Sequence, residues 1–149
     1  MKNNTYKFFW KSFSPFSNWY LCDFKYKNVD FTSSEQAMMW EKALYFGDMV
    51  SADKILKTSD PKIQKALGRS ISNFNAERWD VVKFQLVKEI NRCKFQQNTK
   101  LFVTLKKHQG ITLVEASPFD RIWGIGYSED DALNNIDNCP ATPNPGQED

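Results

Sequence analysis

The run E-A-S-P-F-D-R-I-W-G-I-G (115–126) brings several reactive and ligand-binding residue types close together. It contains a carboxylate, a planar cation, a tryptophan and two glycines: Asp120, Arg121, Trp123, Gly124 and Gly126. Glycines allow a backbone to approach a ligand closely, and an indole stacks on a planar group. The same residues also fit a tight turn with an anchoring tryptophan and a surface Asp–Arg pair. Pattern alone favours this structural interpretation.

A second candidate carboxylate is Glu35, in the run S-S-E-Q. Thr32 with Glu35, and Ser33 with Gln36, both have the spacing of a helix capping box. Glu35 therefore either closes the start of a helix or acts as a reactive carboxylate next to the aromatic loop 14–20. Both interpretations stay open at this point.

Cations for a phosphate group are also present, at Lys42, Arg69, Lys94 and Arg121. Each one alone is typical of a solvated surface charge. Lys94 differs because it falls near Ile90 and Cys93 on the inner stripe of the longest predicted helix, where a lysine needs a reason. It is a candidate for phosphate or ribose contact, or for attack as an amine if burial lowers its pKa.

Helices are expected to position these residues. Capping residues, glycine stops and apolar spacing predict helices at 33–46, 48–57, 60–68, 76–96, 99–108 and 130–136. Short strands are expected at Phe8–Trp10, Lys25–Phe31 and Ile111–Ala116. The strands do not alternate regularly with the helices. The pattern thus predicts a helix-rich α+β fold with a few short strands rather than a doubly wound sheet.

The length of 149 residues fits one domain with one core. We expect this domain to span residues 1–137, followed by a proline-rich tail at 138–149 that is loop or disordered. The 12 Phe, 5 Trp and 5 Tyr residues either form an aromatic core or partly line a cleft for a planar ligand.

Composition argues against several classes of function. A net charge of +2 is too small to indicate polyanion binding by itself. Three scattered cysteines and a single histidine, His108, argue against a zinc site and a histidine-based triad. His108 is expected at an exposed helix C-terminus. The first residues show neither a signal peptide nor a membrane span, so a cytoplasmic location is expected.

Four blocks follow one another in a specific order: P-F-S-N-W (15–19), S-S-E-Q-A-M-M-W-E-K-A-L-Y-F-G-D (33–48), Trp79 with K-F-Q-Q-N (94–98), and L-V-E-A-S-P-F-D-R-I-W-G-I-G (113–126). In order and spacing they resemble the NADAR superfamily of YbiA-like N-glycosidases, from about Phe8 to Ile136. The resemblance implies an α+β fold with prominent helices and no metal or organic cofactor. It places family positions on Asn18, Glu35, Lys42, Trp79, Lys94, Asp120, Trp123, Gly124 and Gly126.

The activity implied by the resemblance is hydrolysis of an N-glycosidic bond. The expected substrate is a small phosphorylated, nucleotide-like molecule: a phosphoribosylated aminopyrimidine among the early riboflavin-pathway intermediates. Two alternatives stay open, namely removal of ADP-ribose from guanine in nucleotides or nucleic acid, and non-catalytic binding of ADP-ribose or a related nucleotide. No membrane and no obligate protein partner are expected.

An oxocarbenium-like state at the ribose C1 would be stabilised by a carboxylate. We expect Glu35 or Asp120 to supply it while the other orients the ribose hydroxyls, with Lys94 as a third catalytic candidate. Trp79 and Trp123 are expected to sandwich the base or shape the pocket. Asn18, Lys42, Arg121, Gly124 and Gly126 complete the predicted substrate contacts.

The resemblance departs from the family pattern at the C-terminal end. Family members usually continue past the proline-rich segment with an asparagine and an amphipathic helix, whereas this sequence ends at Asp149. Truncation of the sequence and divergence of this member from the family would each account for the absence of that last core helix.

Overall fold

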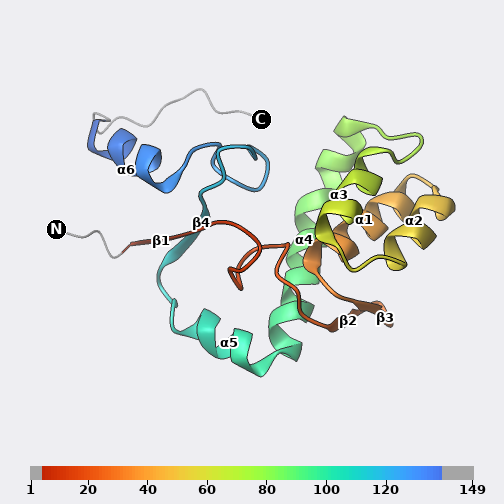
Figure 1. The fold of residues 1–149 in the computed structure, drawn as a ribbon, viewed down its shortest axis with the longest axis horizontal. Coiled ribbons are helices and arrows are strands. Elements are labelled where there is room, and N and C mark those ends of the chain that lie inside the picture. The colour runs from red at the N-terminus through yellow and green to blue at the C-terminus, as the bar shows by residue number, and fades with distance from the viewer. Residues whose placement is uncertain (1–4, 139–149) are drawn as a thin grey trace. The chain divides into compact units, whose positions relative to one another are not determined.

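The computed structural model describes residues 5–138, which form two compact units (Figure 1). The first unit combines the N-terminal segment up to Trp10 with the chain from Ile111 onward, and the second is Lys11–Gly110. The second unit is therefore continuous in sequence, while the first is assembled from both ends of the chain.

The first unit is built on a pair of parallel strands, β1 (Tyr6–Phe9) and β4 (Thr112–Glu115). Helix α6 (Glu129–Asn138) follows a loop after β4. The strands predicted at the two ends of the chain and the final short helix are thus confirmed, each with bounds that differ by one or two residues.

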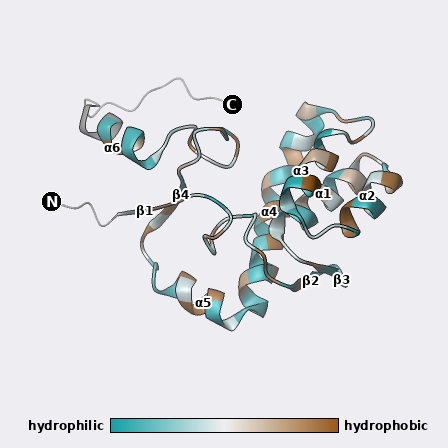
Figure 2. Cartoon of the chain, viewed as in Figure 1, coloured by the Kyte–Doolittle hydropathy of each residue, from teal (hydrophilic) through white to brown (hydrophobic). Residues whose placement is uncertain are grey.

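The second unit contains five helices, and each carries both polar and apolar residues (Figure 2). They are α1 (Ser34–Tyr45), α2 (Met49–Leu56), α3 (Pro61–Arg69), α4 (Ala76–Gln97) and α5 (Thr99–Lys106). Helix α1 packs against α2, α3 and α4, and it carries much of the buried core. The residues at the start of α1 are consequently held by three neighbouring helices.

Helix starts in this unit are set by the side chains that the sequence indicated. The side-chain oxygens of Ser33, Asp48, Asp60 and Asn75 each accept a hydrogen bond from a backbone N–H in the first turn of α1, α2, α3 and α4, respectively. Such caps satisfy backbone donors that a helix leaves unpaired. The predicted starts of these four helices are therefore confirmed.

One strand prediction was wrong. Residues 25–31 do not form a single strand but most of a hairpin of β2 (Phe24–Tyr26) and β3 (Val29–Phe31). The turn residues Lys27 and Asn28 have φ values of 49° and 62°, as a two-residue hairpin turn of type I′ requires. Asparagine adopts positive φ values readily, but lysine is not typical of such a turn. The sequence pattern at 25–31 therefore indicated one continuous strand.

The predicted α+β class is confirmed, with helices dominating and four short strands in the described part of the chain. Among residues 5–138, no helix is both long and apolar enough to cross a membrane. The predicted domain limit at residue 137 falls within α6. The proline-rich tail from residue 139 onward, and with it the expected loss of a last helix, lies outside the described residues.

Candidate functional site

Glu35 lies in the first turn of α1, yet another residue completes the helix cap. The Ser33 hydroxyl oxygen accepts the N–H of Gln36 at 3.0 Å, and the Gln36 side-chain oxygen accepts the N–H of Thr32 at 2.8 Å. The Gln36 amide also donates to two carbonyl oxygens, those of Ile55 and Thr58. Of the two capping boxes that the sequence allowed, the structure uses Ser33 with Gln36. The N-cap of α1 is therefore Ser33 rather than Thr32, and Gln36 is its capping partner.

The aromatic loop holds the backbone of Glu35 in place. Three successive turn hydrogen bonds shape this loop: Ser14 N–H to the Lys11 carbonyl, Ser17 to Ser14, and Tyr20 to Ser17. The carbonyl oxygen of Asn18 then accepts the N–H of Glu35 at 2.9 Å. The Glu35 residue is only 3% exposed. A carboxylate this deeply buried requires polar or charged compensation.

Asn91 on α4 ties the loop to the start of α1, and sequence analysis did not select it. Its side-chain amide donates to the Asn18 side-chain oxygen at 3.2 Å and to the Val87 carbonyl at 3.0 Å. Its own side-chain oxygen accepts from the Ser34 hydroxyl at 3.1 Å. Asn91 lies three residues before Lys94 and hence on the same side of α4. That spacing was the signal that could have identified it.

Lys94 is fully buried, as its position on the inner stripe of α4 indicated. Its ammonium donates to the Ser17 carbonyl at 2.9 Å and lies 5.5 Å and 5.1 Å from the ring centroids of Tyr20 and Phe95. Burial lowers the pKa of Lys94 to about 8, while the nearby thiol of Cys22 acts in the opposite direction. Lys94 thus anchors the aromatic loop to α4 through its hydrogen bond to Ser17.

Lys42 follows Glu35 by seven residues on α1, two helical turns, which places both on one face. Its ammonium donates to the Gly68 carbonyl at 2.9 Å and lies 4.2 Å from the Phe74 ring centroid. Burial lowers the pKa of Lys42. The Glu35 carboxylate counteracts this effect, and the Arg69 cation reinforces it. Glu35 and Lys42 are therefore electrostatically coupled.

Gly68 permits the close packing that brings α3 to Lys42. A methyl group at this position would lie only 1.8 Å from the Met39 sulfur on α1. The missing side chain thus lets the end of α3 sit directly on α1, with the Gly68 carbonyl presented to Lys42. The sequence had shown Gly68 only as a helix stop, and α3 in fact continues to Arg69.

Trp79 is a buried part of an aromatic cluster rather than an open ligand platform. Trp79 is 7% exposed, and its ring centroid lies 6.3 Å from the ring centroid of Tyr45 and 6.5 Å from that of Phe46. Phe46 in turn meets Phe74, the ring beneath Lys42, at 5.3 Å. Trp79 therefore shapes the surroundings of Lys42 through its neighbours.

The loop after β4 is held together by Asp120. One carboxylate oxygen accepts the N–H groups of Ile122 at 2.8 Å and Trp123 at 3.0 Å. The Asp120 carbonyl accepts the N–H of Gly126 at 3.0 Å, and a methyl group at Gly124 would come within 2.8 Å of the same carbonyl oxygen. The carboxylate and the two glycines are therefore matched to one compact backbone turn.

Arg121 completes this loop. Gly126 has a φ of +74°, and a methyl group there would lie 2.8 Å from the Arg121 side chain. The predicted site residues thus fall into two groups. Five belong to the first unit: Asp120, Arg121, Trp123, Gly124 and Gly126. The other five are in the second unit: Asn18, Glu35, Lys42, Lys94 and Trp79. Asn18 bonds to Glu35, Lys94 bonds to the loop that carries Asn18, and Lys42 shares a helix face with Glu35.

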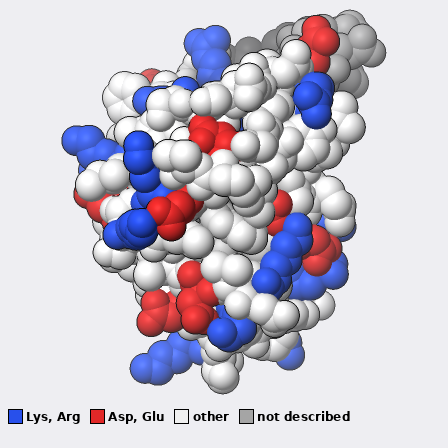
Figure 3. Space-filling view, turned by 90° about the vertical axis from the view of Figure 1, so that its right-hand side faces the viewer, with Lys and Arg blue, Asp and Glu red and all other residues white. Residues whose placement is uncertain are grey.

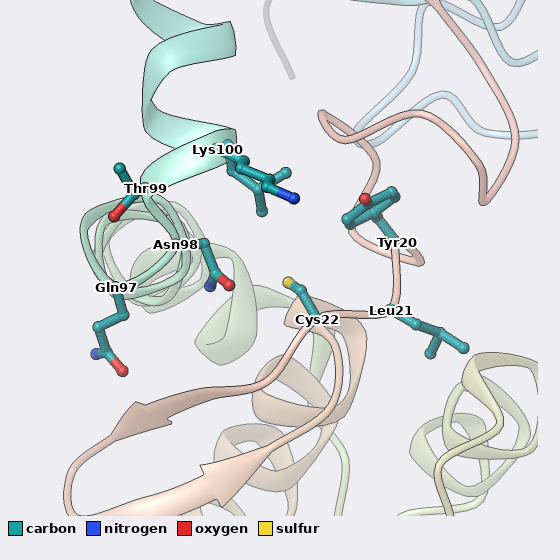
Figure 4. Close-up of a pocket in the computed structure, with 8 residues that line it drawn as sticks. Tyr20, Leu21, Cys22, Gln97, Asn98, Thr99 and Lys100 are labelled. Atoms are coloured by element: carbon teal, nitrogen blue, oxygen red, sulfur yellow. The ribbon is translucent and has the colours of Figure 1, made fainter.

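A cavity of about 320 Å³ opens beside residues 20–22 and the junction of α4 and α5 (Figure 4). The Lys100 side chain and the Tyr20 ring lie on opposite sides of the view, and the Cys22 thiol lies below them (Figure 4). Burial raises the pKa of Cys22, and Lys94 opposes that effect. The lining contains no carboxylate, so this cavity offers no side chain of the kind that an acid–base reaction requires.

Among the described residues, no group of three or more His, Cys, Asp and Glu side chains could hold a metal ion. His108 is half-buried, with its ring nearly perpendicular to that of Phe16 and Nδ1 2.8 Å from the Thr104 carbonyl oxygen. Acidic and basic residues are interspersed on the face shown in Figure 3. This mixture does not resemble the continuous basic surface that binds a nucleic-acid backbone.

Similarity to known proteins defines the family. Residues 8–142 match the NADAR domain. The chain is 46% identical to N-glycosidase R617 of Acanthamoeba polyphaga mimivirus, across 80% of this chain and 73% of that protein. It is 29% identical to N-glycosidase YbiA of Shigella sonnei, across 76% of this chain and 69% of that protein. The chain belongs to the NADAR family, whose members include proteins named N-glycosidases.

The fold agrees with this assignment. The NMR structure of the E. coli protein YbiA matches with a TM-score of 0.72 and 23% sequence identity. The match covers 96% of this chain and 94% of the YbiA chain. The helix-rich α+β architecture is therefore that of YbiA.

Proposed function

We propose that this protein is an N-glycosidase, a hydrolase that cleaves the base–ribose bond of a phosphoribosylated aminopyrimidine. The observation that carries the proposal is the state of Glu35. It is buried, it is not the residue that completes the helix cap, and it is electrostatically coupled to Lys42 on the same helix face. The names of the relatives R617 and YbiA support the same class of reaction.

The reaction breaks the bond between the ribose C1 and a nitrogen of the base. The bonding electrons leave with the base, whose nitrogen takes up a proton, and C1 acquires oxocarbenium character. Water then adds its oxygen to C1 and gives up a proton, which yields ribose 5-phosphate and the free base. The Glu35 carboxylate stabilises the positive charge at C1 and accepts the proton of the attacking water.

Lys42 and Lys94 take different roles in this proposal. Lys42 is half-buried beside Arg69, so its ammonium can contact the ribose or the phosphate. Lys94 is fully buried and donates to the Ser17 carbonyl. It positions the loop that carries Asn18, which in turn holds the Glu35 backbone.

The loop of the first unit contributes by its shape. Asp120 uses one carboxylate oxygen to fix the backbone around Trp123, so we assign Asp120 a positioning role. Trp123 is half-buried and Arg121 is exposed, and both remain proposed substrate contacts along with the backbone at Gly124 and Gly126. Of the two predicted carboxylates, Glu35 is therefore assigned the catalytic role and Asp120 the structural one.

The decisive assay measures released sugar and free base. The protein is incubated with the phosphoribosylated aminopyrimidine and, separately, with ADP-ribosyl-guanosine. We expect hydrolysis of the first. Hydrolysis of the second alone would assign the activity to guanine de-ADP-ribosylation, and binding without release of sugar would make the protein a nucleotide-binding module.

The variant Glu35→Gln tests the chemistry, because it removes the charge while keeping the side-chain shape. We expect the hydrolysis rate to fall by about 10²- to 10⁴-fold with little change in melting temperature. Glu41→Gln is the matched control, since Glu41 is also buried on α1 but pairs with Lys27 at 2.5 Å. The control should lose stability and keep its rate. A wild-type rate in Glu35→Gln would reject the proposed role of Glu35.

A further inference from the structure

A second cavity, of about 410 Å³, lies where the aromatic loop meets the start of α3. Its lining comes from residues 12–13, 19–21 and 60–61, all within the second unit. Its volume is within the range of small-molecule sites, which are concave and lined by aromatic residues with a few polar groups. The predicted function has so far given this cavity no role.

Aromatic side chains form much of its lining. Phe13, Trp19 and Tyr20 all contribute, and Phe13 is 76% exposed. The Ser17 hydroxyl accepts the N–H of Trp19 at 3.1 Å, which holds the indole-bearing segment in place. Trp19 and Tyr20 are half-buried. Aromatic residues that are partly open to a cavity offer flat faces on which a planar ring can stack.

Two charged groups adjoin the aromatic lining. The Lys65 ammonium lies 5.7 Å from the centroid of the Trp19 ring, so positive charge is available next to the indole for a phosphorylated ligand. Asp60 lines the cavity, and one of its oxygens accepts the N–H of Lys62 at 2.8 Å as the cap of α3. A carboxylate has two oxygens with about four acceptor positions, so capping leaves acceptor capacity.

We propose that this cavity is the base subsite, which binds a pyrimidine or purine ring bearing an amino group. The ring stacks on Trp19, and its amino group and adjacent ring N–H donate to the Asp60 carboxylate. This inference rests on the proposed function for the identity of the substrate, and it names the group that selects the base. Trp19 directly follows Asn18, whose carbonyl holds Glu35, so one loop links base binding to the candidate catalytic carboxylate.

The test compares guanosine 5′-monophosphate with inosine 5′-monophosphate, which differ only by the amino group. Each is titrated into the full chain labelled with ¹⁵N, and the dissociation constant is read from chemical-shift changes. We expect the shifts at the Trp19 indole N–H and around Asp60, with guanosine monophosphate binding about tenfold more tightly. Equal affinities in the wild type, or shifts confined to other residues, would overturn the proposal.

Asp60→Asn removes the carboxylate while retaining a good helix cap, since asparagine caps as well as aspartate. It should abolish the preference for guanosine monophosphate. Asp48→Asn is the matched control, because Asp48 caps α2 in the same way and does not line the cavity. The control should keep the preference. An unchanged preference in Asp60→Asn would overturn the proposal.

This binding test does not depend on cleavage. Amino-selective binding at Trp19 without any hydrolysis would support the base subsite and reject the proposed function. Hydrolysis whose KM is unchanged by both Trp19→Leu and Asp60→Asn would reject the base subsite and leave the proposed function intact.

Discussion

The ammonium of Lys94 donates a hydrogen bond to the carbonyl oxygen of Ser17 at 2.9 Å, across 77 positions of the sequence. This contact joins the last turn of α4 to the aromatic loop within the second unit. It places a positive charge in a fully buried position, where burial lowers the pKa of the lysine to about 8. The effect of Lys94 on the free energy of unfolding therefore depends on pH.

Lys94→Met gives the first prediction, which concerns stability. Between pH 8 and 10.5 the unfolded wild type binds more protons than the folded protein, so the Lys94 contribution to stability rises with pH. We expect the unfolding free energy of the wild type, relative to the variant, to increase by about 2–3 kcal/mol from pH 7 to pH 10. Urea unfolding of both proteins at both pH values measures it. A constant difference would contradict the lowered pKa.

Lys42 provides a second prediction, about catalysis. Lys42→Met removes the cation coupled to Glu35, and we expect kcat/KM to fall by about 100-fold. Lys42→Arg keeps the positive charge and should recover part of that loss. Steady-state kinetics on the three proteins provide the comparison. If arginine recovers nothing while the protein stays folded, positive charge alone does not account for the role of Lys42.

Gly68→Ala is expected to be destabilising, against the usual trend for a helical glycine. Alanine normally favours a helix by about 1 kcal/mol, but here its methyl group would overlap the Met39 side chain. We expect a net loss of about 1–3 kcal/mol from overpacking. Thermal unfolding of Gly68→Ala, Met39→Ala and the double variant would check the cause. The double variant should lose less stability than the two single losses combined, because the clash is absent.

Asp120 is predicted to act through the shape of its loop. Asp120→Ala removes the acceptor of two backbone N–H groups and should cost about 1–3 kcal/mol, together with a tenfold or greater loss of kcat/KM. Asp120→Asn keeps an acceptor oxygen and should retain most of the stability and most of the kcat/KM. A folded but inactive Asp120→Asn would show instead that the negative charge takes part in the reaction.

Features that depend on near neighbours in sequence could be predicted well. The caps at Ser33, Asp60 and Asn75 each bond within three residues, so their signals are local. Apolar periodicity likewise placed Lys94 on a buried stripe. Local chemistry was thus sufficient to position helices and to identify one unusual lysine.

Features that depend on distant segments could not be predicted. Asn91 matters because it bonds to Asn18, 73 positions away, and Gly68 because its carbonyl meets Lys42, 26 positions away. Gly68 does not differ from an ordinary helix-ending residue when only its neighbours are considered. The spacing of Asn91 from Lys94 shows which side of α4 it occupies, but not which residue it bonds to. The choice between Glu35 and Gln36 as capping partner was also settled by packing, since Gln36 bonds to the carbonyl of Ile55 in the last turn of α2 and to that of Thr58 just after it.

The pairing of β1 with β4 has a consequence for the order in which the chain folds. Tyr6 pairs with Thr112, so this contact closes a loop of roughly 100 residues, a large entropic cost that local helices avoid. The second unit, Lys11–Gly110, is complete before β4 has been synthesised. On the ribosome, the helices around Glu35 can therefore assemble first, while β1 remains without its strand partner until β4 has emerged.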